Sequence, residues 1–569
     1  MKNSKPKSKA PSFSPSPLWI WIAILLITFI GYSAALKNGF TNWDDDTYVI
    51  DNPLLKNPSW QSVFAMFSSP YYLLYTPFTI LSFAINYWFM GKDAFPIIFT
   101  NILIHAVNAV LCGILSYRLS GKLGVGLIAG ILFGLHPQHV ESVAWISERK
   151  DVLFTFFILG GMCHWAQNPS ENKPLFILMN TLWMLAACLS KPTAVIYPAL
   201  LLGIDYLNNK PISVKLILEK IPLGILSLFF GWLLLYGVDT QGGQTHDTGD
   251  TSHSFTGIDT VLIAIYSFVW YPIKMIFPWP LNAFYAYPFN HEPLPLFYML
   301  SPVLAVFMIG SVIYGFWKKW KFYVFAWLIY MVGIFLFIKL LTTVGAVTYD
   351  RYFYVASIGF CVGAGFLFWK FLQIPSLKII TGIILLIFIS GYAWAVNQRC
   401  KVWKNSYTLM SDMIEGNPNK VPFAYNNRGL WLTEQGRTEE ALSDFQNSIR
   451  LDPKSPKAWL NAGKLLGQNN QIDSAIYYLE NAQKLDPHDS KVYNNLGNAY
   501  GMKGNWNAAI SSFTEALKFE PNNVNALFNL GITHGLAGDT VRADSLLRLS
   551  ARQGFVPAQQ SLQSRGKPW

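Results

Sequence analysis

The chain has 569 residues, of which 52% are hydrophobic and 13% are charged, and its formal net charge is +11. This length predicts at least two folding units, and the excess of Lys and Arg does not indicate a nucleic-acid partner, because much of it lies in the N-terminal tail and in short loops between apolar stretches. Five cysteines are scattered without paired spacing, which argues against a disulfide framework and a zinc site.

The N-terminal region combines a basic tail, residues 1–17, with an apolar stretch at 18–36. An Asp-rich segment follows this stretch, where a secreted protein would have a small-residue cleavage site. We therefore expect a cytoplasmic tail and a retained first transmembrane helix rather than a signal peptide.

Further apolar stretches follow as far as residue 397, and a span needs about 20 apolar residues, or fewer when other helices surround it. The candidate spans are 18–36, 95–117, 123–136, 152–167, 174–189, 193–207, 217–238, 297–316, 322–341, 353–372 and 377–396. Two amphipathic stretches, 75–90 and 258–278, are expected to lie along the outer interface. The sequence thus predicts a multi-pass membrane domain over 18–397 with about eleven spans.

The loop charges orient these spans. With a cytoplasmic N-terminus, the inner loops contain Arg118 and Lys122, Lys173, Lys210 and Lys215, Lys318, Lys319 and Lys321, and Lys370 and Lys378. Every inner loop is then basic, as the positive-inside rule requires. An odd span count places the C-terminal region outside the cytoplasm. The chain has no Asn-x-Ser/Thr sequon with a permitted middle residue, which favours a bacterial inner membrane with the C-terminal region in the periplasm.

Residues 421–569 are polar and internally repetitive. Three columns recur at intervals of 34 residues, namely Gly429, Gly463, Gly497 and Gly531; Ala441, Ala475, Ala509 and Ala543; and Pro453, Pro487 and Pro521. This period predicts tetratricopeptide repeats near 422–455, 456–489, 490–523 and 524–557, with a capping helix around 557–564. Such a solenoid offers a concave groove for a peptide or protein segment, or serves as a scaffold or dimerisation module.

Polar residues of the predicted outer face gather in four places. These are Asp44–Asp46 after the first span, the loop from His136 to Asp151, Ser190–Thr193 and Thr348–Tyr352. Charged groups close to a membrane are costly, so we interpret them as functional rather than as solvated loop charges. Three successive aspartates cannot all face one atom, because neighbouring side chains diverge along a helix or strand.

These residue types suit acid–base chemistry beside an anion. An aspartate is a candidate base for a hydroxyl, and Arg351, Arg149, Lys150 or Lys191 can hold a phosphate. His136 and His139, with Glu141, resemble metal ligands. Pro137 interrupts the helix that would align them and no HExxH motif is present, so a zinc protease is weakly supported, and binding of substrate or backbone is the simpler reading.

The Asp motif, the His136–Asp151 loop, Asp350-Arg351-Tyr352 and the repeats together resemble the transmembrane-and-tetratricopeptide-repeat O-mannosyltransferases and their bacterial relatives, which are C-type glycosyltransferases. The resemblance covers essentially the whole chain. It implies an all-α membrane domain of that type followed by an α-solenoid, a polyprenyl-phosphate sugar donor, and catalysis by Asp44 or Asp45. The candidate substrate-binding residues are Asp46, His136, His139, Glu141, Arg149, Lys150, Lys191, Asp350 and Arg351. Relatives with monophosphate donors generally use no metal, so we assign neither a metal nor another cofactor.

We expect a membrane hexosyltransferase that moves a mannose-like sugar to a hydroxyl of a protein or envelope acceptor, with the repeats recruiting the acceptor. The alternatives are a lipid-linked saccharide transporter and a non-catalytic membrane scaffold. A transporter should carry its ionisable residues near the bilayer midplane, whereas here they lie at the outer margin. A scaffold predicts that substitution of Asp44–Asp46 is silent.

Overall fold

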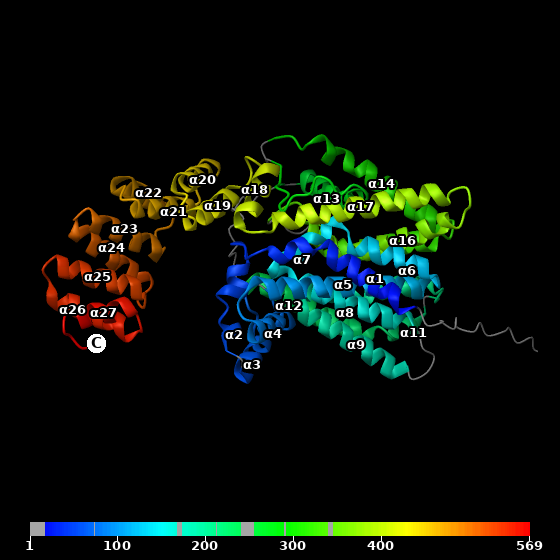
Figure 1. Cartoon of the computed structure of the whole chain (residues 1–569), viewed down its shortest axis with the longest axis horizontal. Helices are drawn as coiled ribbons and strands as arrows, with labels where there is room; N and C mark the ends of the chain where they lie inside the picture. Colours follow the sequence, from blue (N-terminus) through cyan, green and yellow to red (C-terminus); the bar gives the residue numbers. More distant parts are fainter. Residues whose placement is uncertain are drawn as a thin grey trace, which may run out of the picture. The chain divides into compact units, whose positions relative to one another are not determined.

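The computed structural model describes residues 17–57, 59–72, 74–167, 173–211, 213–240, 255, 257–288, 292–338 and 345–569 (Figure 1). The predicted tail therefore lies outside the described residues except for Pro17. The chain divides into two compact units, the first ending at Gly416 and the second running from Asn417 to Trp569. The described residues form helices and turns with two isolated β-bridges and no strand, so the all-α prediction is confirmed.

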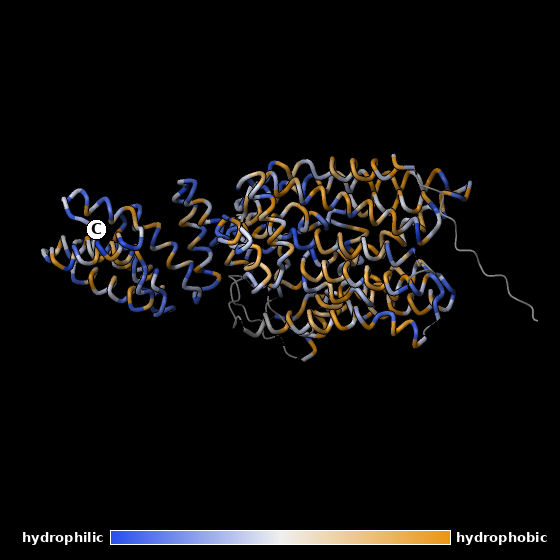
Figure 2. Tube along the Cα trace, turned by 90° about the horizontal axis from the view of Figure 1, so that it is seen from below, coloured by the Kyte–Doolittle hydropathy of each residue, from blue (hydrophilic) through white to orange (hydrophobic). Residues whose placement is uncertain are grey.

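The first unit consists of apolar helices of unequal length. Its helices are α1 (Leu18–Gly31), α2 (Pro53–Lys56), α3 (Trp60–Ser68), α4 (Pro77–Met90), α5 (Ala94–Ser120), α6 (Leu123–Gly134), α7 (Val140–Ala144), α8 (Arg149–Ala166), α9 (Lys173–Ser190), α10 (Tyr197–Leu207), α11 (Val214–Leu218), α12 (Ile221–Thr240), α13 (Ile258–Ile276), α14 (Leu296–Trp317), α15 (Lys321–Ile334), α16 (Phe353–Leu372), α17 (Lys378–Val402) and α18 (Ser406–Gly416). Figure 2 shows hydrophobic residues along most of this unit and mainly hydrophilic residues along the second.

Six helices of the described residues are long and apolar enough to cross a membrane, and a bent pair formed by 123–134 and 137–144 makes a seventh candidate. Four further apolar helices are shorter. These findings fit a multi-pass membrane protein, but length and composition do not confirm the expected count of about eleven. Helix α13, expected along the interface, is itself among the six. The sidedness of the later loops therefore stays a prediction.

Helix α5 lies at the centre of the first unit, in contact with α1, α6 and α8, and α6 in turn packs on α16. Glycines permit the closest approach. A Cβ added at Gly126 of α6 would lie 2.7 Å from the carbonyl oxygen of Gly113 on α5. Small residues at such crossings let helix backbones pack together in lipid, where no hydrophobic force drives them. The crossing fixes the end of α6, from which the His136–Asp151 segment begins.

The second unit is a row of helical hairpins closed by a single helix. Its helices are α19 (Pro422–Glu434), α20 (Thr438–Leu451), α21 (Pro456–Gln468), α22 (Ile472–Leu485), α23 (Ser490–Met502), α24 (Trp506–Phe519), α25 (Val524–Leu536), α26 (Thr540–Arg552) and α27 (Val556–Ser564). Each repeated glycine faces the second helix of its own hairpin: a Cβ at Gly497 would lie 2.6 Å from the Phe513 ring. The predicted tetratricopeptide-repeat architecture is confirmed.

Candidate active site

The structure separates the three adjacent aspartates. Asp45 is fully buried and both of its carboxylate oxygens accept hydrogen bonds. Oδ2 accepts from the backbone N and the Oγ1 of Thr41, at 2.8 and 2.9 Å, and Oδ1 accepts from the backbone N and the Oγ of Ser147, at 3.0 and 2.5 Å. Asp45 thus ties the first loop to the turn before α8.

Burial raises the pKa of Asp45 to about 6, and the hydrogen bonds from Ser147 and Thr41 only partly oppose this effect. The carboxylate is therefore still charged at neutral pH but protonates in mildly acidic solution. Four donors around one carboxylate hold it in place, and its two oxygens have little capacity left for a substrate proton.

Asp44 and Asp46 have different surroundings. Asp44 is half-buried and lies close enough to Tyr48 and Lys150 to interact with both electrostatically. Asp46 is exposed at the start of a short π-helical turn, Asp46–Ile50. Successive residues of a helix-like turn point in directions about 100° apart, which is why the three adjacent aspartates have different surroundings.

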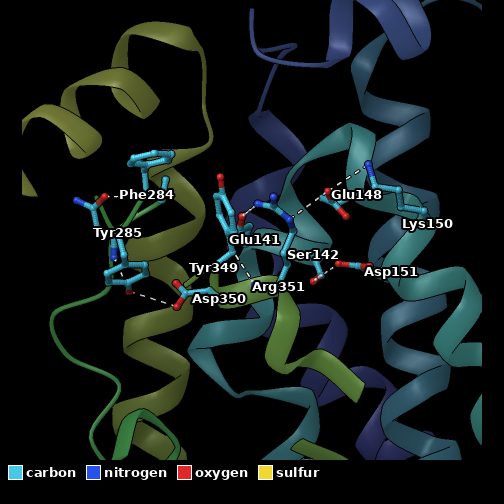
Figure 3. Close-up of polar contacts among 12 residues, drawn as sticks. Glu141, Ser142, Glu148, Lys150, Asp151, Phe284, Tyr285, Tyr349, Asp350 and Arg351 are labelled. Carbon is cyan, nitrogen blue, oxygen red and sulfur yellow. Dashed lines mark hydrogen bonds and ion pairs between the residues drawn. The ribbon is translucent and has the colours of Figure 1, made fainter. Parts of the chain in front are cut away.

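Glu148 is the centre of a group of cations that come from three segments. Its carboxylate lies 3.2 Å from Lys150 Nζ, 3.9 Å from Lys191 Nζ and 3.4 Å from Arg351 Nε. Burial alone would raise the pKa of Glu148, but these three cations lower it to about 2. Figure 3 shows Glu148 between Lys150 and Arg351. The group is therefore ionised at every physiological pH.

Arg351 is held by carboxylates and aromatic rings. Its Nη1 forms an ion pair with Glu141, and its backbone N donates to Glu141 Oε2 at 3.0 Å. The guanidinium carbon lies 3.8 Å from the ring centroid of Tyr349 and 5.4 Å from that of Trp145. Glu141 and Arg351 are far apart in the sequence, yet the structure brings them together at the start of α7 (Figure 3).

Lys150 and Lys191 complete the cationic group. Lys150 Nζ lies 4.7 Å from the ring centroid of Tyr48, which belongs to the first loop. Lys191 is paired with Asp151, whose other oxygen accepts from Ser142 Oγ at 3.2 Å. Both lysine side chains are buried. The cluster thus contains Lys150, Lys191 and Arg351 together with Glu141, Glu148 and Asp151, so that its charges are internally balanced.

Asp350 points away from this cluster, although it is adjacent to Arg351. It is buried, and Oδ1 accepts from the Tyr285 hydroxyl at 3.2 Å (Figure 3). The nearby cation is Arg399, which in turn donates to Asp412 at 2.5 Å. Asp350 therefore lies near Tyr285 and Arg399, and it shares the neighbouring Glu141 carboxylate with Arg351.

The two histidines are joined to the protein core. His136 Nε2 lies 3.2 Å from the Met275 carbonyl, and its Nδ1 accepts from Gln138 N at 3.3 Å. His139 bonds the Phe133 carbonyl at 2.8 Å and the Ser357 hydroxyl at 2.9 Å. Both rings are fully buried, so the structure favours backbone positioning over contact with a substrate. Within the described residues, no three His, Cys, Asp or Glu side chains form a group that could hold a metal ion.

Arg149 also lies outside the cluster. Its Nε donates to Asn101 Oδ1 at 2.7 Å, its Nη1 to the Ser82 carbonyl at 3.0 Å and to Asn86, and its Nη2 to the Ile97 carbonyl at 2.6 Å. These acceptors belong to α4 and α5, and the guanidinium is fully buried. Arg149 therefore ties α8 to α4 and α5, and we no longer place it at the substrate.

Several residues that organise the site were not among the sequence candidates. Glu148, Asp151 and Ser147 all lie in the predicted outer loop, but nothing in the local sequence distinguishes them from surface polar residues. Trp145 was also missed. Its ring stacks on Trp43 at 4.8 Å and on Trp403 at 5.2 Å, which joins the first loop to the end of α17. The sequence did contain a signal for this contact, because Trp43 directly precedes Asp44–Asp46 and Trp145 lies within the loop from His136 to Asp151.

Comparison with known proteins relates both units of this chain to named families of proteins. Two family descriptions, both "Tetratricopeptide repeat", match residues 490–523 and 432–496. "Protein O-mannosyl-transferase F38B6.6" of Caenorhabditis elegans is 24% identical over 471 residues, covering 79% of this chain and 64% of that protein. The resemblance to the O-mannosyltransferases is confirmed.

Two further matches have narrower coverage. "Protein O-mannosyl-transferase tmtc2" of Xenopus laevis is 28% identical over 42% of this chain and 31% of its own length. The chain thus spans less than two thirds of the length of these curated relatives. Among solved structures, the crystal structure of MamA is 18% identical, with a TM-score of 0.25, and covers 26% of this chain and 88% of its own.

Proposed function

We propose that the chain is a membrane glycosyltransferase that moves a mannose-like sugar from a polyprenyl-phosphate donor to a hydroxyl of a protein or envelope acceptor. The observation that carries this proposal is the convergence of three distant segments. Asp45 bonds Ser147, Lys150 lies over Tyr48, and Arg351 pairs with Glu141. The similarity to protein O-mannosyl-transferases supplies the reaction class.

Asp44 is the proposed base, because Asp45 already accepts four hydrogen bonds. The acceptor oxygen attacks the anomeric carbon, its proton passes to Asp44, and the bond between that carbon and the phosphate oxygen breaks. The lipid monophosphate leaves with the bonding electrons. One displacement inverts the anomeric centre, and no covalent carboxylate intermediate is required. Asp45 acts as a positioning residue that holds the loop of Asp44 against Ser147.

Arg351 and Lys150 are the proposed phosphate ligands. A guanidinium has five N–H donors, and the observed ion pairs of Arg351 involve Nη1 and Nε. Its side chain is 13% exposed, against 8% for Lys150 and 7% for Lys191, so it is the best placed of the three cations for a ligand. Glu141 and Glu148 fix the guanidinium before the donor arrives, and such preorganised charges stabilise a leaving phosphate without reorganisation.

The predicted orientation of the spans implies on which side of the membrane the reaction takes place. We propose that the site faces the periplasm of a bacterial inner membrane, together with the repeats, because the inner loops are then basic. A phosphatase fused at Lys420 should be active and one fused at Lys319 inactive. Activity at Lys319 alone would overturn the orientation and leave the chemistry of the cluster to be tested separately.

A sugar-transfer assay tests the proposed glycosyltransferase function. Purified protein is incubated with polyprenyl-phosphate mannose and a hydroxyl-containing protein acceptor, and glycosylation of the acceptor is measured by mass spectrometry. Wild type should transfer mannose and Asp44→Asn should not. If Asp44→Asn and Asp45→Asn both retain wild-type turnover, the cluster is not the catalytic centre and the scaffold alternative takes precedence.

A further inference from the structure

The segment that joins the two units is packed as part of the membrane unit. It comprises residues 399–416, which include the last turn of α17 and the whole of α18, and the repeat unit begins directly after it at Asn417. A polypeptide that only connects two domains is usually exposed and makes few contacts. In this joining segment, by contrast, side chains along its length are buried, among them Cys400, Trp403, Leu409 and Met413. The joining segment therefore has a structural role besides connecting the units.

The joining segment lies along the first loop, which contains Asp44. Three hydrogen bonds connect the two in the same chain order, each with its donor on the first loop: Asn38 Nδ2 donates to the Cys400 carbonyl, Gly39 N to the Lys404 carbonyl and Asn42 N to Ser406 Oγ, all at 2.9 Å. The last of these donors is two residues from Asp44. The backbone that leads to the proposed base is therefore held by the joining segment.

Trp403 adds an aromatic contact to these hydrogen bonds. Its ring stacks on Trp43, the residue immediately before Asp44, with centroids 6.4 Å apart and an angle of 6° between the planes, and it also stacks on Trp145. The Trp403 side chain is buried, and among the described residues its Nε1 has no hydrogen-bond partner. Its contribution is therefore the flat apolar surface of the ring, which a phenyl ring partly replaces.

The other end of the joining segment is fixed to the part of the chain that reaches Asp350. Asp412 Oδ2 accepts from Ala283 N at 3.0 Å, and the Asp412 carbonyl accepts from Asn282 Nδ2 at 2.6 Å. Two residues beyond Ala283, the Tyr285 hydroxyl donates to Asp350 (Figure 3). The joining segment thus contacts two separate segments that contribute to the candidate site.

We propose that the joining segment is a positioning element of the catalytic site, in which Trp403 and Ser406 hold the first loop so that Asp44 faces the acceptor hydroxyl. This role deepens the proposed function and rests on it, because Asp44 is the proposed base. A base removes a proton only within hydrogen-bond reach, and a displacement of about 1 Å can lower the rate about 100-fold. Asp45 holds the loop against Ser147, and the joining segment supplies further contacts. The repeats are therefore attached through a part of the site rather than through an independent linker.

Full-length protein in detergent is compared with four variants. Trp403→Ala removes the stacked ring, Trp403→Phe keeps a ring, and Ser406→Ala removes the acceptor of Asn42 N. Trp394→Ala is the matched control, because this tryptophan lies nine residues earlier, on α17, and is 58% exposed. Two quantities are measured: sugar transfer, as kcat and the KM for the lipid donor, and amide hydrogen exchange of residues 39–45, which does not require catalysis.

Trp403→Ala should lower kcat by about 100-fold through displacement of the base, and Ser406→Ala by about 10-fold through loss of one hydrogen bond to the loop. The KM for the lipid donor should be unchanged, because the proposed phosphate ligand Arg351 keeps its ion pair with Glu141. Trp403→Phe should recover most of the lost turnover, and Trp394→Ala should transfer sugar as wild type does. A donor KM that rises while kcat stays at the wild-type value overturns the positioning role.

Exchange of the amides of residues 39–45 should become faster in Trp403→Ala and Ser406→Ala and remain as in wild type in Trp394→Ala. Ser406→Ala removes only a hydroxyl, so it keeps the comparison decisive if Trp403→Ala does not fold. Unchanged exchange in the alanine variants that fold, wild-type kcat in those variants, or an equal loss of kcat in Trp403→Phe and Trp403→Ala each overturns the proposal. If wild type transfers no sugar but exchange follows the expected pattern, the joining segment holds the loop and only the proposed glycosyltransferase function is contradicted.

Discussion

The two units use polar residues in opposite ways. In the repeat unit, Asn, Lys and Arg residues recur at a fixed step, remain partly exposed and form pairs mostly with residues less than 36 positions away. In the membrane unit the polar contacts are buried and join distant segments, such as Glu141 with Arg351 and Asp45 with Ser147. A periodic unit therefore distributes polar contacts along its length, whereas the membrane unit concentrates charge at one point.

This difference has an energetic basis. A repeat buries its apolar face against its neighbours, so each hairpin contributes to stability in a similar way. A charge removed from water is tolerated only with partners, so the membrane unit must place Glu148 beside Lys150, Lys191 and Arg351. Substitutions in the cluster should therefore have large and localised effects, and those in the repeats smaller and graded ones.

The largest expected effect follows from removing the proposed base. Asp44→Asn keeps the shape of the side chain and removes the proton acceptor, so turnover should fall by about 10²–10⁴-fold. Steady-state sugar transfer measures this loss, and the melting temperature should stay within a few degrees of wild type because Asp44 is only half-buried. If Asp44→Asn turned over at the rate of wild type, Asp44 would not be the base, and the membrane unit would lose the large, localised effect that distinguishes it from the repeats.

Arg351 should come next in size. Arg351→Ala removes the guanidinium from the proposed donor phosphate, and Arg351→Lys keeps the charge but loses the fork. We expect the KM for the lipid donor to rise by about 10- to 100-fold in both, as for the loss of a charge-assisted hydrogen bond. Lys56→Ala, at an exposed lysine of the first loop region, is the control and should leave the KM unchanged. Full donor affinity in both Arg351 variants would contradict the assignment.

Asp45→Asn should act on stability rather than directly on chemistry. One carboxylate oxygen becomes an amide that faces a backbone N–H of Thr41 or Ser147, and this donor-to-donor contact should cost about 1–3 kcal/mol of unfolding free energy. Thermal unfolding followed by intrinsic fluorescence gives the value. A melting temperature equal to that of wild type would show that Asp45 does not anchor the loop.

The pH dependence of this loss has a definite sign. The folded pKa of about 6 lies above the unfolded value of about 4, so the folded state binds the proton more tightly. The contribution of Asp45 to stability is therefore complete below about pH 4 and falls as the pH rises through about 6. The difference in melting temperature between wild type and Asp45→Asn should be larger at pH 5 than at pH 7.5.

In the repeats, helix α23 offers a matched pair of glycine substitutions whose effects on stability should differ in sign. Gly497→Ala would place a Cβ 2.6 Å from the Phe513 ring and should destabilise the unit by about 1–3 kcal/mol. Gly501→Ala, one turn later in α23, meets nothing within 4 Å and should stabilise it by up to about 1 kcal/mol. Urea unfolding of both variants measures the difference, and equal stability would contradict the close packing of the glycine column.

The repeat fold was predictable because its information is local. Gly497 and Phe513 are sixteen residues apart, within one hairpin, and the step that places them recurs along the chain. The apolar stretches of the membrane unit were likewise visible, but their number of crossings was not. Helix α13 is apolar enough to span yet was assigned to the interface, because loop charges and helix length point in different directions there.

From the sequence, one could predict which segments contribute to the candidate site, but not which of their side chains meet. Residue type identified Asp44, Lys150, Lys191 and Arg351, but it could not show that Arg149 turns toward Asn101 while its neighbour Lys150 turns toward Tyr48. Adjacent helical positions diverge by about 100°, so neighbours in one motif reach different surroundings. Glu148 was overlooked because its partners come from segments that only the tertiary fold brings together.

The pairing of Glu141 with Arg351 also has a consequence for how the protein is made. Arg351 follows Glu141 by 210 residues, and ribosomes add about 5–20 residues per second, so roughly 10–40 s separate the two during synthesis. Throughout that interval the nascent membrane unit holds Glu141 without its guanidinium. The cation that pairs with the buried Glu141 carboxylate is therefore available only after the segment that leads into α16 has been synthesised.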